Sequence, residues 1–177
     1  KMFTDCRSKK IVFVAHCILN QNSISDETAV YPGIVDEILE LFISSQIGVI
    51  QMPCPELMCL GLDRGIVDGG SIPVLEENTR IRASMSNELM NPKIDQMVKN
   101  TICQIIEYDK FNFQILGIIG INRSPSCGVD TTSDNNREIE GKGLFVSSLI
   151  KALEDHQLSI KACSILILVI ITIRYKR

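Results

Sequence analysis

The stretch that decides the fold is KIVFVAHC, residues 10–17, a short apolar run that ends in a histidine and a cysteine. Its isoleucine and valines favour a β-strand that is buried on both faces. Similar apolar runs return at residues 47–52 and 113–119. The loop after each run carries a cysteine, and these are Cys17, Cys54 and Cys127.

Segments with apolar residues at helical spacing separate the predicted strands. We predict helices at residues 33–43, within 78–90, from 92 onwards and at 143–155, and a fourth strand within 164–173. Near-continuous apolar strands that alternate with helices predict a Rossmann-like three-layer α/β domain with a mainly parallel sheet and helices on both faces. A chain of 177 residues is expected to form one such domain over residues 1–177.

The composition favours a small-molecule partner. The net charge is −3 and aromatic residues make up 5% of the chain, which argues against a nucleic-acid binder. The apolar run at 165–171 is shorter than the roughly 20 residues that a membrane-spanning helix needs, so no membrane partner is expected. The first residues contain no apolar signal segment, which predicts a cytoplasmic protein.

Seven cysteines without a secretory signal predict reduced thiols rather than a disulfide framework. A single buried cysteine is usually packing. However, the carboxyl ends of parallel strands meet at one edge of the sheet, where functional crevices lie. We therefore expect Cys17, Cys54 and Cys127 to converge on one site. The remaining cysteines lack this placement and are predicted to be structural: Cys6, Cys59, Cys103 and Cys163.

Three convergent thiolates favour a metal site with an open position. Structural zinc sites normally take four ligands in short pairs such as Cys-x-x-Cys, and the sequence contains no such pair. A [4Fe–4S] cluster is usually held by four cysteines, so three would leave one iron open. His16 could be a fourth ligand by its proximity to Cys17, but adjacent residues of an extended segment face opposite sides. We therefore interpret His16 as a supporting or structural residue rather than a ligand.

Three segments around these cysteines resemble the signature of the thiouracil desulfurase family, formerly a domain of unknown function. They are HCILN at 16–20, PCPEL at 53–57 and SPSCG at 124–128. Residues 61–64, GLDR, and 129–133, VDTTS, are also similar to the desulfidase-related branch of that family. The resemblance covers about residues 10–160, whereas residues 161–177 form an atypical tail.

The resemblance implies a [4Fe–4S] cluster on Cys17, Cys54 and Cys127, with a free iron that takes the sulfur of the substrate. It implies an enzyme that removes sulfur from a small thiolated compound, such as a thiopyrimidine, without redox chemistry and with release of sulfide. Catalysis would fall to Glu56 and Ser124. The expected substrate contacts are Asn20, Ser126 and Arg64.

Each supporting residue also has a plainer interpretation. Glu56 suits a helix N-cap or a solvated carboxylate, and Arg64 a surface charge. The hydroxyls of Ser124 and Ser126 suit a turn, as does the segment 130–133. At the level of the whole protein, the alternatives are a metal-binding or sulfur-carrier protein without turnover, and a purely structural domain.

Overall fold

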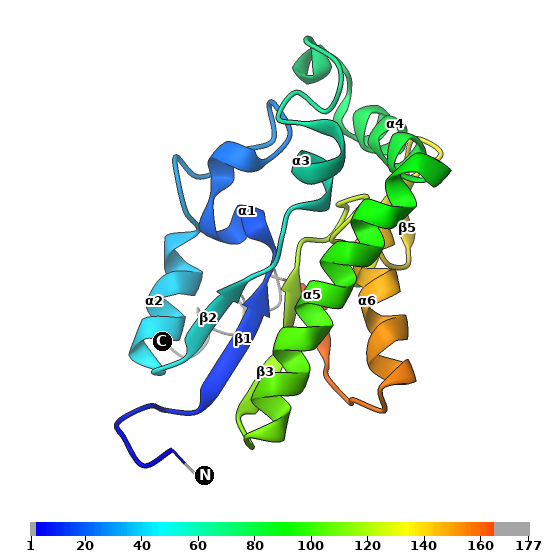
Figure 1. Cartoon of the computed structure of the whole chain (residues 1–177). Coiled ribbons are helices and arrows are strands. Elements are labelled where there is room, and N and C mark those ends of the chain that lie inside the picture. The colour runs from blue at the N-terminus through cyan, green and yellow to red at the C-terminus, as the bar shows by residue number, and fades with distance from the viewer. Residues whose placement is uncertain (1–2, 165–177) are drawn as a thin grey trace.

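The computed structural model describes residues 3–164 and has a parallel β-sheet between two layers of helices (Figure 1). The sheet consists of β1 (Lys10–Val14), β2 (Gly48–Gln51), β3 (Gln114–Gly120) and β6 (Ala162–Ser164). The strand order is β2-β1-β3-β6, and all neighbours are parallel. The predicted Rossmann-like α/β fold class is therefore confirmed.

The helices cover both faces of this sheet. α2 (Asp36–Ser44) lies on one face, and α5 (Asn91–Lys110) and α6 (Leu144–Asp155) lie on the other (Figure 1). α4 (Val74–Met85) lies beyond the carboxyl ends of the strands. The predicted helices at 33–43, 92 onwards and 143–155 match α2, α5 and α6. The segment 78–90 is partly helical, because α4 ends at Met85 and only a short 3₁₀ turn, Glu88–Met90, follows.

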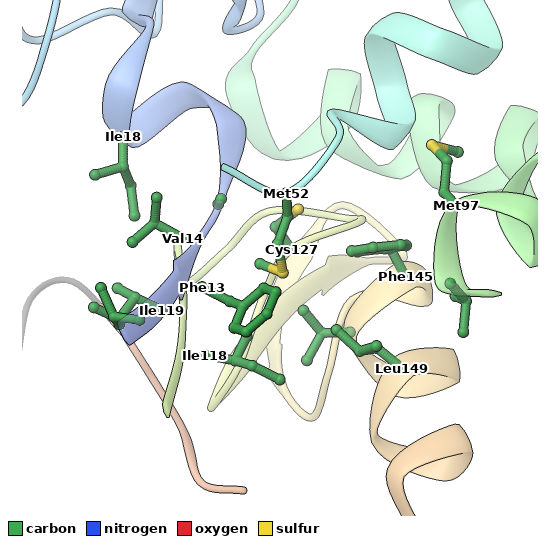
Figure 2. Close-up of a cluster of buried hydrophobic side chains, with 14 of the residues drawn as sticks. Phe13, Val14, Ile18, Met52, Met97, Ile118, Ile119, Cys127, Phe145 and Leu149 are labelled. Carbon is green, nitrogen blue, oxygen red and sulfur yellow. The ribbon is translucent and has the colours of Figure 1, made fainter. Parts of the chain in front are cut away.

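The hydrophobic core lies between the sheet and these helices (Figure 2). Phe13 and Val14 of β1 are fully buried, as are Ile118 of β3 and Leu149 of α6. The apolar face predicted for α5 from its helical spacing is buried as a set: Ile94, Met97, Val98, Ile102 and Ile105. Burial of one face of each helix is what holds the layers together.

The strand order places a switch point between β1 and β3. From β1 the chain crosses to β2 on one side, and from β2 it returns past β1 to β3 on the other side. The loops that leave the carboxyl ends of β1 and β3 therefore diverge, which opens a crevice between them. This crevice is the place where ligands bind in open parallel sheets.

Two segments differ from the prediction. The residues after β1 form a short helix, α1 (His16–Leu19), followed by a 3₁₀ turn, Gln21–Ser23. The turn expected at residues 130–133 is wrong, because β4 (Thr131–Asp134) pairs with β5 (Arg137–Glu140) in an antiparallel hairpin. Asn135 and Asn136 form the tip of this hairpin with positive φ angles of 49° and 56°, as a two-residue turn of this kind requires.

The segment after β2 is more regular than its glycines and prolines suggest. α3 (Pro55–Leu60) follows directly, and a 3₁₀ turn, Gly69–Ser71, precedes α4. Most of the fourth strand predicted within 164–173 lies outside the described residues, as does the apolar run at 165–171. Among residues 3–164, no helix is long and apolar enough to cross a membrane.

Candidate functional site

Cys17, Cys54 and Cys127 line one cavity of about 170 Å³ at the switch point. Cys17 lies in the first turn of α1, after β1, and Cys54 is the N-cap residue of α3, after β2. Cys127 lies in the loop after β3, is 5% exposed and lines the cavity, and it also belongs to the buried core cluster (Figure 2). The expected convergence of the three cysteines is thus observed.

Local hydrogen bonds hold the loops that carry Cys54 and Cys127. Pro55 begins α3, where its missing N–H costs no hydrogen bond, and Cys54 Sγ accepts from the Leu57 N–H at 3.5 Å. In the loop after β3, Ser124 Oγ accepts from the N–H groups of Ser126 and Cys127, at 3.3 and 3.0 Å. These two backbone contacts are the ones that the turn-forming interpretation of Ser124 predicts.

The three thiols influence one another electrostatically. In the metal-free protein, burial raises the pKa of Cys17 to about 12, and the charges of Cys54 and Glu56 act in the same direction. Burial also raises the pKa of Cys54, followed by the charge of Glu56. The pKa of Cys127 is raised well above its usual range by burial and then by Cys17 and Cys54. Binding of a metal centre here must therefore release protons.

The cavity offers three cysteine thiols, the ligand type that iron–sulfur clusters take. Within the described residues, no group of three or more His, Cys, Asp or Glu side chains is close enough to hold one metal ion. A single ion needs its donors at about 2.0–2.3 Å from one point. A [4Fe–4S] cluster spreads its irons over a larger volume and takes cysteine thiolates as ligands. Three thiols from three loops line this cavity.

Glu56 is buried beside the cysteines, at 7% exposure, and its carboxylate is held on both oxygens. Oε1 accepts from Ser126 Oγ at 2.6 Å and from Ser124 Oγ at 3.3 Å. Oε2 pairs with Arg64 Nε at 3.2 Å. The solvated interpretation of Glu56 is thereby wrong, and so is the N-cap interpretation, because Cys54 occupies the N-cap position of α3.

Arg64 is buried at 2% exposure and is not a surface charge. Besides Glu56, its guanidinium donates to the carbonyls of Gly61, Leu62 and Ser23, at 2.8, 3.2 and 2.5 Å. These bonds link the segment after Cys17 to the segment after Cys54, while Glu56 links both to the serines beside Cys127. Arg64 therefore ties together the three cysteine loops. Its expected contact with substrate stays a prediction.

The other two expected substrate contacts differ in position. Ser126 lines the cavity, is 1% exposed, and also lies 3.6 Å from Cys127 Sγ. Asn20 is not among the residues that line the cavity. Its Oδ1 accepts from the backbone and side-chain nitrogens of Asn22, at 3.2 and 3.0 Å, which caps the 3₁₀ turn.

The structure adds residues to the cavity wall that sequence reasoning missed. His16 lines it together with Cys17, and the extended conformation assumed for this segment is wrong, because His16–Leu19 is helical. The supporting or structural role of His16 stays a prediction. Burial, followed by the charge of Arg64, lowers the pKa of His16. Ser25 and Asn78 also line the cavity. The position next to Cys17 was a usable signal for His16, whereas nothing local marks Asn78.

The four remaining cysteines lie outside this cavity. Cys6 and Cys103 are exposed, so Cys103 is not the buried filler that its helix suggested. Cys59 is buried in the core, and Cys163 is partly exposed. A wider depression of about 560 Å³ adjoins the cysteine cavity and shares Ile24, Ser25 and Arg64 with it, but no cysteine lines it.

No family model matches the chain. A relative does: the uncharacterized protein MJ0003 of Methanocaldococcus jannaschii is 30% identical over 156 residues, which cover 88% of this chain and 85% of that protein. The chain belongs to the same family as MJ0003. With this relative the shared length includes nearly all of both proteins, so the family relationship applies to the chain as a whole.

Among solved structures, the chain is similar to a [4Fe–4S]-dependent thiouracil desulfidase, TudS. The sequence identity is 15% and the TM-score is 0.48, over 88% of this chain and 91% of that chain.

Proposed function

We propose that this chain is an iron–sulfur-dependent desulfurase that removes sulfur, without redox chemistry, from a small thiolated compound of the thiopyrimidine type. The observation that carries the proposal is the meeting of Cys17, Cys54 and Cys127 at a cavity that Glu56 also lines. The family resemblance of the segments around these residues implies the same cofactor and reaction.

In this proposal Cys17, Cys54 and Cys127 hold a [4Fe–4S] cluster. When bound, the cluster supplies a Lewis acid of soft character that suits a thiocarbonyl sulfur. Three cysteines leave one iron without a protein ligand, and an open coordination position is what a substrate atom needs.

The proposed reaction exchanges sulfur for oxygen. A thiocarbonyl compound and water give the carbonyl compound and hydrogen sulfide, so no electrons are gained or lost. Water is a weak nucleophile, and Glu56 is the carboxylate positioned to accept its proton. Arg64 and Ser126 hold that carboxylate in place at the cavity wall. Ile24, Val74 and Ile121 add apolar surface, which limits the water that enters.

Anaerobic reconstitution tests the proposal. We expect the protein to take up iron and acid-labile sulfide, and then to release sulfide from 2-thiouracil or a related thiolated ring. Cys17→Ser, Cys54→Ser and Cys127→Ser are each expected to lose the cluster. Cys103→Ser is the matched control, because Cys103 is exposed and does not line the cavity, and this variant is expected to load normally.

Two results would contradict the proposal. Zinc uptake without iron, or iron uptake without sulfide release from any thiolated ring, would favour a metal-binding or sulfur-carrier protein. A protein that binds no metal under strict anaerobiosis would favour a structural domain. Loss of the cluster in Cys59→Ser with retention in Cys17→Ser would show that the ligand assignment is wrong.

A further inference from the structure

Three polar groups in the cysteine cavity have no hydrogen-bond partner among residues 3–164. They are the imidazole of His16, the hydroxyl of Ser25 and the side-chain oxygen of Asn78, and all three residues line the cavity. Ser164 Oγ is the buried side-chain atom of the described residues that lacks a partner. The groups on His16, Ser25 and Asn78 lack a partner but are not among the fully buried atoms, so they are accessible to solvent or to a ligand.

The neighbouring polar groups differ, because the protein already engages them. The guanidinium of Arg64 binds one carboxylate and three carbonyls. The hydroxyls of Ser124 and Ser126 are directed to Glu56. Asn122 accepts three backbone N–H groups of the segment 129–131. A ligand in the cavity thus finds free bonding capacity on His16, Ser25 and Asn78, and beside them on the half-exposed guanidinium of Arg123, whose Nε pairs with Glu138.

The network around Asn78 fixes which end of its amide faces the cavity. Asn78 Nδ2 donates to the carbonyl of Arg123 at 3.3 Å and to Ser133 Oγ at 3.2 Å. Ser133 Oγ donates its own proton to the same carbonyl at 2.6 Å, so it can only accept from Asn78. The amide cannot be flipped without losing both bonds. Its oxygen is therefore the free end, and it can only accept a hydrogen bond.

The charge of the cavity is balanced from within. Glu56 and Arg64 neutralise each other at its wall, and both are buried. Arg123 also lines the cavity, and its half-exposed guanidinium pairs with Glu138 at 3.6 Å. The apolar side chains of Ile24 and Val74 complete the lining. A cavity of this kind favours an uncharged ring over an anion or a cation.

We propose that His16, Ser25 and Asn78 are the substrate-contact residues of this site, and that they recognise the edge of an uncharged ring that carries at least one N–H donor. The N–H is required because Asn78 offers an acceptor only. His16 offers at least one N–H donor in either protonation state, and Ser25 can donate or accept. The inference rests on the proposed function, and the three residues come from α1, the loop after it and α4.

The chain's two histidines allow a direct test by NMR. Protein labelled with ¹⁵N-histidine is reconstituted anaerobically and titrated with uracil, a ring that lacks the reactive sulfur. We expect the ring nitrogen signals of His16 to shift. His156, exposed at the end of α6, is the internal control and should not shift. If neither signal moves, or both move equally, the inference is overturned.

Variants and analogues test the other two contacts. Ser25→Ala is expected to weaken binding of 2-thiouracil about tenfold, the scale of one hydrogen bond, with unchanged iron content. Ser147→Ala, on the exposed side of α6, is the control and should bind normally. Of 1-methyl- and 3-methyl-2-thiouracil, at least one should bind at least tenfold more weakly, because it blocks the N–H that faces Asn78. If both methylated rings bind as tightly as 2-thiouracil, the role of Asn78 is overturned.

The outcomes separate this inference from the proposed function. A protein that loads its cluster and desulfurises 2-thiouracil, but shows no shift at His16 and no loss in Ser25→Ala, keeps the function and overturns the contacts. A protein that never loads iron, yet shows the His16 shift with uracil, keeps the contacts and overturns the cluster-dependent reaction.

Discussion

At the scale of single residues, Glu56 combines two properties that rarely occur together. It is buried, and its carboxylate has three side-chain partners, namely Arg64, Ser124 and Ser126. A buried charge with such partners is tolerated, and its position is fixed within narrow limits. A fixed carboxylate at the wall of a cysteine cavity is suited to accept a proton from a reacting water.

Glu56→Gln separates binding from chemistry. The amide keeps the shape of the side chain and can still accept from Ser126, but it cannot take up a proton at neutral pH. We expect normal cluster content and a loss of turnover of about 100-fold or more. Sulfide release and cluster absorbance measure the two quantities. Glu77→Gln, which removes another buried and ion-paired carboxylate, is the control for general effects of charge removal and should retain turnover.

The Glu56–Arg64 pair also predicts a non-additive effect on stability. Removal of one partner from a buried pair leaves an uncompensated charge and typically costs about 3–5 kcal/mol. We expect Arg64→Gln to lower the free energy of unfolding by an amount on that scale. The double variant Glu56→Gln with Arg64→Gln should be more stable than Arg64→Gln alone, because no charge is left unpaired. Urea unfolding of the metal-free proteins measures this, and simple additivity would contradict a direct pair.

At the scale of elements, two glycines allow the backbone to pack closely against the loop that carries Cys127. A Cβ atom on Gly143, the residue before α6, would lie 2.8 Å from the backbone nitrogen of Cys127 and would also overlap Ser126. A Cβ atom on Gly128 would lie 2.8 Å from the carbonyl oxygen of Ser124. The start of α6 thus packs directly on the cysteine loop.

Gly143→Ala should therefore disturb the site without removing a ligand. We expect the loop to shift and cluster content to fall severalfold, since the backbone atoms it meets cannot yield as a flexible side chain would. Gly33→Ala is the control, because a Cβ atom there meets nothing within 4 Å. Iron and sulfide content per chain are the measurements. Equal loading of both variants would show that the loop adapts freely.

The elements also show where sequence reasoning succeeds and where it stops. The strands and the long helices have enough periodic apolar residues to be predicted, and the parallel order then brings the three cysteines together. α1 has only four residues, which is too short for a period to appear. The hairpin β4–β5 has one wholly exposed strand, so its alternation carries little signal, although Asn135-Asn136 marks its turn. The partners of Arg64 depend on tertiary contacts that no local pattern encodes.

At the scale of the whole molecule, the cysteine site makes the stability of the metal-free protein sensitive to alkaline pH. A thiol whose pKa is raised on folding binds more protons in the folded state than in the unfolded state. For Cys17 this holds between the ordinary value of 9.0 and about 12. Well below pH 9.0 the Cys17 thiol is neutral in both the folded and the unfolded state, so it does not lower the free energy of unfolding there. As the pH rises toward 12, the thiol ionises in the unfolded state first, and the free energy of unfolding falls.

We therefore expect the metal-free protein to lose stability between about pH 9 and about pH 12, by up to about 1.4 kcal/mol per pH unit for a single fully shifted thiol. Urea midpoints at about pH 8 and about pH 10.5 measure the loss. The variant with Ser at positions 17, 54 and 127 is the control, and its midpoint should fall less over the same interval. Parallel declines in both proteins would contradict the assignment of the effect to these thiols.

The first strand of the chain, β1, lies inside the sheet with β2 on one side and β3 on the other. During synthesis β1 emerges from the ribosome long before β3 exists, so one of its edges waits unpaired until residues 114–120 have been translated. Such distant pairing slows folding and gives a high contact order. Cys17 and Cys54 meet Cys127 only at that late stage. Any cofactor that needs all three can therefore be bound only after residue 127 has been translated and β3 has joined the sheet.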